Sequence, residues 1–135
     1  MSVCYYIIDM QTHDRDRLSR IRQSLYELAK EIEQLVPVLA ARHPLVKGTV
    51  YEQRRKCGKP SCHCASGVPH SSMILSRSEE GRTRLMAIPS GHLKDVQVLT
   101  ERYQRFRRAR ARLGQIYKTM VSLIDQLEES RRREP

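Results

Sequence analysis

The chain lacks tryptophan, contains a single phenylalanine, and has no long apolar run. A transmembrane helix needs about 20 consecutive, mostly apolar residues, so we expect no membrane span. Aromatic residues make up 5% of the 135 residues. So few large side chains leave little material for a broad, compact core. We therefore expect a narrow apolar seam between helices and a small cross-linked module, all within a single domain spanning residues 1–135.

A secretory signal and a catalytic constellation are also missing. Residues 1–9 have no basic start and too short an apolar run for a signal peptide. This favours the cytoplasm, where cysteines bind metal or stay free more often than they form disulfides. The chain shows no phosphate-binding loop, no Ser/His/Asp set and no paired carboxylates, so we expect neither enzymatic activity nor a small-molecule substrate.

Positive charge is abundant but unevenly distributed. The formal net charge is +10, yet residues 1–46 are balanced, while residues 47–90 and 91–135 carry the excess. Seven cations and no acid lie between Arg102 and Leu123. A solvated helix usually mixes both signs, because opposite charges one turn apart attract. This one-sign run therefore indicates an anionic partner, with a solvated surface as the alternative.

Two long patterns predict helices with heptad seams. The first helix is expected over residues 14–42 and the second, basic helix over residues 90–131, with residues 1–13 as an N-terminal extension. In both, apolar side chains recur at steps of three and four, the pattern of a coiled coil. The predicted seam positions are Leu18, Ile21, Leu25, Leu28, Ile32, Leu35 and Leu39 in the first helix, and Val96, Leu99, Tyr103, Phe106, Arg110, Leu113, Tyr117, Met120, Ile124 and Leu127 in the second.

Two such helices in one chain most simply form an antiparallel coiled-coil hairpin. In the simplest pairing Leu39 lies near Val96 and Leu18 lies near Tyr117. Arg110 is the only break in the apolar character of the second seam. A homodimer or another coiled-coil partner is the alternative use of the same seams.

Residues 48–89 break the helical period and predict a small Cys/His β module. A β-prone piece covers residues 50–56, and residues 73–77 and 82–88 flank a turn at residues 79–81. The expected fold class is therefore mainly α with a small β/zinc module (α+β). In this fold the helical hairpin carries a short antiparallel sheet and a Cys/His metal loop at one end.

The densest chemical signal is a group of three cysteines followed by a histidine. Zn²⁺ takes four nitrogen or sulfur ligands in a tetrahedron, and the Gly-Lys-Pro turn after Cys57 can bring the cysteines together. Cys57, Cys62, Cys64 and His70 are the expected ligands. His63 competes with His70, but a residue flanked by two ligands tends to point away. A flexible loop with free thiols, or a redox pair, is the alternative to a zinc site.

The same region resembles a bacterial, zinc-ribbon-like family of unknown function. Its members share a CGKPxCxCA signature, then a β-hairpin and a long basic helix, and the resemblance extends from Gly48 to Leu127. The chain departs from the family pattern after His70, where Ser71-Ser72-Met73 replaces a Gly-Pro-aromatic step. The resemblance supports the four ligands and implies no activity.

Together these features predict a zinc-stabilised, non-enzymatic nucleic-acid-binding protein that contacts the phosphates of DNA or RNA. The alternative is a coiled-coil protein-interaction adaptor with a structural zinc module, and a thiol-based redox sensor is the third hypothesis. In the predicted register Arg105, Arg108 and Arg112 point away from the seam. The expected phosphate contacts are Arg54, Arg55, Lys56, Lys59, Arg82 and Arg84 in the β module, and Arg102, Arg105, Arg108 and Arg112 in the second helix.

Overall fold

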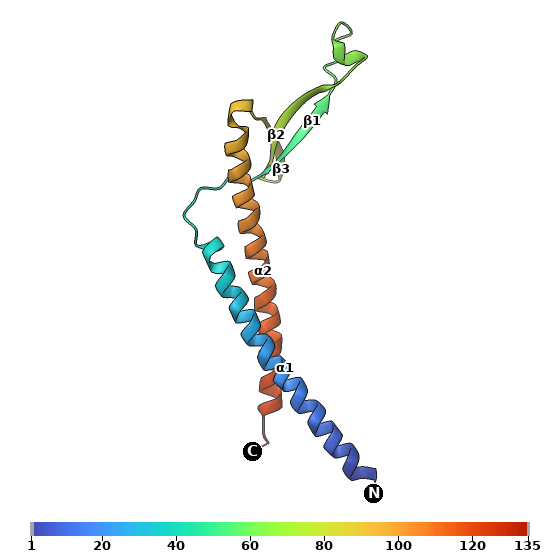
Figure 1. Ribbon diagram of the computed structural model, residues 1–135, viewed down its shortest axis with the longest axis vertical. Coiled ribbons are helices and arrows are strands. Elements are labelled where there is room, and N and C mark those ends of the chain that lie inside the picture. Colours follow the sequence, from blue (N-terminus) through green and yellow to red (C-terminus); the bar gives the residue numbers. More distant parts are fainter. Residues whose placement is uncertain (1, 135) are drawn as a thin grey trace. The chain divides into compact units, whose positions relative to one another are not determined.

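The computed structural model describes residues 2–134, with side chains from residue 11 onward. It contains two long helices and a three-stranded antiparallel sheet, so the α+β class is confirmed (Figure 1). The elements are α1 (Ser2–Leu39), β1 (Thr49–Arg55), the 3-10 helix η1 (His63–Ala65), β2 (His70–Glu79), β3 (Arg82–Ala87), η2 (Ser90–His92) and α2 (Leu93–Arg131).

The chain divides into two units, which we call the helical unit and the sheet unit. The helical unit comprises Met1–Ala41 and Arg108–Pro135, and the sheet unit comprises Arg42–Arg107. Within residues 2–134, no helix is both long enough and apolar enough to cross a membrane.

The first helix has different ends from those predicted. It begins at Ser2 and not at residue 14. Asp14 lies inside α1, where its carboxylate accepts a hydrogen bond from Arg17 at 3.2 Å. An acid followed one turn later by an arginine suits a helix interior as well as a helix start. The helix also continues through Pro37 before it ends at Leu39.

The apolar face of α2 differs from the predicted seam in the helical unit. Ile116 is fully buried and Ala109 is 6% exposed, whereas Tyr117 is 69% and Ile124 is 50% exposed. Arg110, a predicted seam position, is exposed. The predicted seam is therefore wrong at every second position in this half of α2, where the residue that faces the other helix is the one before the predicted residue.

The reason for this error is that the chain offers two registers of nearly equal apolar character. Ile116 precedes Tyr117 and Leu123 precedes Ile124, so steps of three and four fit either face. In the observed register, Ala109 and not Arg110 lies on the apolar face, so this face contains no charged residue.

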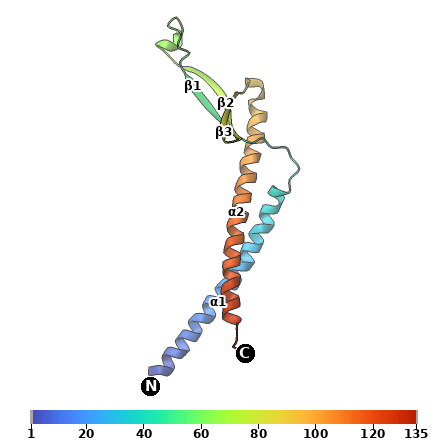
Figure 2. The ribbon, with the colours of Figure 1, turned by 180° about the vertical axis from the view of Figure 1, so that it is seen from behind.

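The predicted pairing of the two helices is also wrong. In the helical unit, α1 and α2 run in opposite directions and cross (Figures 1 and 2). Arg112 of α2 donates a hydrogen bond to Glu31 of α1, with Nη2 and Oε2 2.8 Å apart. The predicted pairing places Arg112 beside residue 23 of α1, and Glu31 lies about two helical turns away from that residue. Arg112 therefore contacts the other helix and does not point away from it.

The connector after α1 is hydrogen-bonded to the early turns of α2 in the sheet unit. The backbone N–H of Val46 donates to the carbonyl of Leu99, and Gln104 Nε2 donates to the carbonyl of Gly48, at 3.1 and 3.0 Å. In the sheet unit, the connector thus lies along the early turns of α2.

The sheet is a meander with the order β1-β2-β3. Glu80 and Gly81 form the turn between β2 and β3 with φ of 50° and 74°. Positive φ at both central residues is typical of a type I′ hairpin turn. Ile74 and Leu75 of β2 supply the buried apolar side chains of the sheet.

Gly48 is needed where the chain enters the sheet. Its φ is 145°, and a Cβ there would lie 2.7 Å from Leu75 Cδ1 and 2.7 Å from the carbonyl oxygen of Ser76. Only glycine adopts this backbone conformation readily, so Gly48 sets the close approach of the chain to β2.

Candidate metal centre

Residues 56–69, which we call the metal loop, connect β1 to β2. Cys57 follows closely after β1, and His70 is the first residue of β2, where it pairs with Arg55. Strand pairing thus brings the two ends of the loop together. Cys64 lies in η1 and Cys62 lies directly before it. The short helix η1 thus places Cys62 and Cys64 near the end of the β1–β2 pair, where Cys57 and His70 lie.

Local turns hold the loop in shape. Gly58 adopts a φ of 80°, as the predicted Gly-Lys-Pro turn requires. The backbone N–H of Cys62 donates to the carbonyl of Lys59, and that of Ala65 donates to the carbonyl of Cys62, both at 3.1 Å. Lys56 Nζ donates to the carbonyl of Ala65 at 3.3 Å, which joins the start of the loop to η1.

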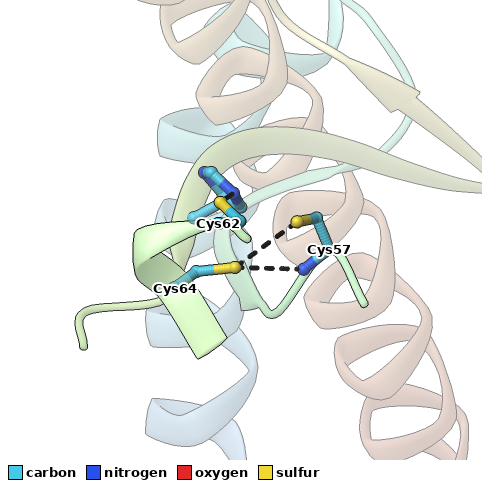
Figure 3. Close-up of side chains that lie close together, drawn as sticks. Cys57, Cys62 and Cys64 are labelled. Atoms are coloured by element: carbon cyan, nitrogen blue, oxygen red, sulfur yellow. Dashed lines mark hydrogen bonds between the residues drawn. The ribbon is translucent and has the colours of Figure 1, made fainter. Parts of the chain in front are cut away.

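Four potential ligands converge in this loop. The Sγ atoms of Cys57, Cys62 and Cys64 and a ring nitrogen of His70 all lie within 4.8 Å of one another. Cys57 Sγ is 3.5 Å from Cys64 Sγ, and Figure 3 shows the three cysteines close together. Cys62 Sγ is 3.2 Å from His70 Nε2. With Zn–S bonds of about 2.3 Å, two sulfurs of a tetrahedral site are ~3.8 Å apart. The four residues can therefore hold a metal ion, and their chemistry is consistent with zinc.

His63, the histidine within the metal loop, is not part of this group. His63 Nδ1 is 3.8 Å from Cys62 Sγ. Its ring stands edge-on to that of His70, with the centroids 5.3 Å apart and an angle of 76° between the planes. Among the alternatives left open by the sequence, the structure brings His70 and not His63 to the three cysteines.

The surroundings of the thiols differ. A backbone hydrogen bond from Lys59, aided by hydrogen bonds from Cys64 and His70, lowers the pKa of Cys57 to about 6. A backbone hydrogen bond involving Cys64 lowers the pKa of Cys62. The backbone N–H of Cys57 also favours the thiolate of Cys64, but burial and the neighbouring sulfurs outweigh it and raise the pKa of Cys64.

The histidine responds in the opposite direction. Hydrogen bonds to Cys57 and Cys62 raise the pKa of His70. The negative charge of the thiolates favours a positive charge in the space between the three sulfur atoms and the imidazole. A divalent metal ion would supply that charge and replace the protons.

Half of the predicted phosphate contacts are engaged within the protein. Glu52 pairs with Arg54 at 3.3 Å, and Glu79 pairs with Arg84 at 2.9 Å. The remaining engaged residues are Lys56, bonded to Ala65, Arg102, which donates to the carbonyl of Pro44, and Arg112, paired with Glu31. Arg84 and Arg112 have their acids on another strand and on the other helix, which no local sequence pattern indicates. Glu52, in contrast, lies two residues before Arg54 on the same strand and could have been recognised from the sequence.

The other half form no ion pair with an acidic group in the described part of the chain. These residues are exposed and make no side-chain hydrogen bond or ion pair within residues 11–134, whose side chains the structure describes. They are Arg55, Lys59, Arg82, Arg105 and Arg108.

A family model described as a domain of unknown function, DUF6788, matches residues 16–98. The matched stretch includes most of α1, the whole sheet and all four ligands, and it ends in the early turns of α2. No curated protein and no solved structure matches the chain significantly.

Proposed function

Because the chain belongs to the DUF6788 family, a family of unknown function, we propose its function from its own residues. We propose that it is a zinc-stabilised, non-enzymatic protein that binds the phosphate backbone of nucleic acids. The metal group supports the first half of this proposal, and the unneutralised arginines of α2 support the second.

Zinc is the metal that suits this group best. Three thiolates and one imidazole are a soft donor set that favours Zn²⁺ over Mg²⁺ or Ca²⁺, which prefer oxygen. Cys57, Cys62, Cys64 and His70 would fill all four tetrahedral positions. A catalytic zinc keeps one position open for water or substrate, so this zinc-ribbon-like loop has a structural role. Elemental analysis of the purified protein should find close to one zinc per chain, and a metal-free protein with an ordered loop would disprove the proposal.

The observation that carries nucleic-acid binding is the exposure of Arg105 and Arg108. They lie one turn apart on α2, and no acid in the described part of the chain accepts from either guanidinium. Like charges one turn apart repel each other and weaken a helix. A polyanion would remove this repulsion, because each phosphate neutralises one cation and releases a condensed counterion.

The test reverses these two charges with Arg105→Glu and Arg108→Glu in one variant. Fluorescence anisotropy with duplex DNA between about 50 and about 200 mM salt should show weaker binding, with the slope of log affinity against log salt flatter by about 1.8. Arg112 is left unchanged, because its reversal would break the ion pair with Glu31.

The matched control reverses two exposed cations of α1, Arg22→Glu and Lys30→Glu. Neither side chain makes an ion pair or hydrogen bond with any of the side chains described from residue 11 onward. Affinity and salt slope should stay close to those of the wild type. If both variants lose affinity equally, Arg105 and Arg108 contribute only through the net charge of the protein. If the test variant loses no affinity, these two arginines do not contact the nucleic acid.

The second candidate function is a coiled-coil adaptor that binds a second copy of this chain. The observation in its favour is an exposed apolar stripe on α2, formed by Tyr117, Val121 and Ile124 at helical spacing. Analytical ultracentrifugation distinguishes the two candidates. The adaptor is favoured if the wild type is a stable dimer and the double variant Tyr117→Ser, Ile124→Ser is a monomer. It is excluded if the wild type is itself a monomer.

A further inference from the structure

The end of the sheet nearest the metal loop is a ribbon of only two strands. β3 pairs with residues 74–79 of β2, whereas β1 pairs with residues 70–76. Residues 52–55 of β1 and 70–73 of β2 thus extend beyond β3. We call this segment the ribbon. Figures 1 and 2 show the metal loop at its far end.

The ribbon and its loop are exposed and basic. From residue 52 to residue 73 the chain contains four cations, namely Arg54, Arg55, Lys56 and Lys59, and one acid, Glu52. Glu52 is already satisfied, because it accepts hydrogen bonds from Ser71 and from Arg54. These two bonds hold its pKa below the ordinary value, so it stays ionised while paired. Arg55 and Lys59 remain available to an external anion.

One face of the ribbon also carries uncharged polar groups. Residues paired across the two strands point to the same side. Gln53 pairs with Ser72, and Arg55 pairs with His70. The amide of Gln53, the hydroxyl of Ser72 and the guanidinium of Arg55 therefore lie on one side of the ribbon, where they can donate to base edges as well as to phosphates.

We infer that this ribbon binds in the major groove of duplex DNA, with the metal loop at its leading end. This inference rests on the proposed nucleic-acid binding and names the type of nucleic acid. The major groove of B-form DNA is about 12 Å wide and admits a two-stranded β-ribbon. The major groove of an RNA duplex is too narrow for side chains to enter. Duplex DNA is therefore preferred over duplex RNA of the same sequence.

The metal loop has a direct part in this binding. An isolated two-stranded hairpin is marginally stable in water. Cys57, just after β1, and His70, at the start of β2, would hold a common metal and would thereby join the two strands where β3 no longer pairs with them. Rigid strands enter a groove at a lower entropic cost than mobile ones.

The first experiment compares duplex DNA, duplex RNA and single-stranded DNA of one sequence by fluorescence anisotropy. The variant carries Arg55→Ala and Lys59→Ala, which leave all four ligands in place. Its affinity for duplex DNA should fall about tenfold, with a salt slope flatter by about 1.8. The control carries Arg22→Ala and Lys30→Ala in α1 and should bind as the wild type does. Zinc content is measured in each protein to show that the loop is intact.

The second experiment locates the protein on the DNA with dimethyl sulfate, which methylates guanine N7 in the major groove and adenine N3 in the minor groove. The wild type should protect guanine N7, and the Arg55→Ala, Lys59→Ala variant should lose this protection. Protection of adenine N3 alone would overturn the inference.

Failure of this inference is distinguishable from failure of the proposed function. Equal affinity for duplex DNA, duplex RNA and single strands, without protection of guanine N7, would leave phosphate binding in place and overturn the ribbon's role. Absence of binding to every nucleic acid tested would overturn both.

Discussion

In the helical unit the buried side chains come from distant parts of the chain, with Ile21 of α1 and Ala109 and Ile116 of α2 shielded from solvent. In the metal loop of the sheet unit, Cys64 is the only buried residue. The helical unit thus depends on burial of apolar surface. The loop depends on backbone turns and on four ligands that a metal would join. The two regions should therefore respond to different perturbations, and each substitution below separates one response from the other.

The largest expected effect is on metal content. Cys62→Ser should lower zinc from close to one per chain to near zero, because a hydroxyl is a far weaker zinc ligand than a thiolate. Backbone amides of residues 56–69 should then exchange hydrogen faster, while the amides of α1 stay protected. His63→Ala is the matched control and should keep its zinc. Equal loss of zinc in both variants would assign His63 to the ligand set.

Truncation in the helical unit should be the next largest effect. Ile116→Ala removes a fully buried side chain and should lower the free energy of unfolding by about 2–4 kcal/mol. Tyr117→Ala, one residue later, removes a side chain that is 69% exposed and should change it far less. Denaturant unfolding followed by circular dichroism measures both. If Tyr117→Ala destabilised the protein more than Ile116→Ala, the register predicted from the heptad pattern would be correct. Neither substitution should alter zinc content.

Two glycine substitutions should act with opposite signs. Gly48→Ala places a Cβ 2.7 Å from Leu75 Cδ1 at a φ of 145°, and should destabilise the sheet unit by about 2 kcal/mol. Gly114→Ala meets no atom within 4 Å in the interior of α2, and should stabilise the helical unit by about 1 kcal/mol. Hydrogen exchange of each unit assigns the effect. Stabilisation by Gly48→Ala would show that the connector does not enter the sheet in this conformation.

The smallest expected effect is that of acid on the helical unit. The hydrogen bond from Arg112 holds the pKa of Glu31 below its ordinary value of 4.5. The folded state binds this proton less readily than the unfolded chain. The stabilisation is therefore complete above the ordinary pKa and is lost as pH falls through the lowered value. Thermal unfolding of the wild type and Glu31→Gln from about pH 7 to about pH 3 should show a smaller decline in the variant. Parallel declines would mean that the pair contributes nothing.

The metal group was predictable from sequence because its geometry is local. Cys57, Cys62, Cys64 and His70 are separated only by short turns, and glycine and proline mark where the chain reverses. Position favoured His70 over His63, since His63 lies between two ligands, but the sequence left both histidines open and the structure brings His70 to the cysteines. The strands were predictable for a similar reason, because their hairpin is closed by the short Glu80-Gly81 turn.

The pairing of the helices was not predictable, because it depends on residues far apart in sequence. Arg112 and Glu31 are separated by 81 positions, and no local pattern identifies one as the partner of the other. The register of α2 failed for a different reason, since Ile116-Tyr117 and Leu123-Ile124 each offer two apolar choices. Arg110 was the available signal. A charged residue in an apolar seam favours the neighbouring face, where Ala109 takes its place.

The short span of the metal loop has a consequence for the order of folding. Residues 57–70 leave the ribosome as one continuous piece, so all four ligands are available to a metal before α2 has been synthesised. Closing so short a loop costs little chain entropy, whereas contacts between α1 and α2 must wait for the rest of the chain. We therefore expect the nascent protein to acquire its metal first, with the helical unit assembling last.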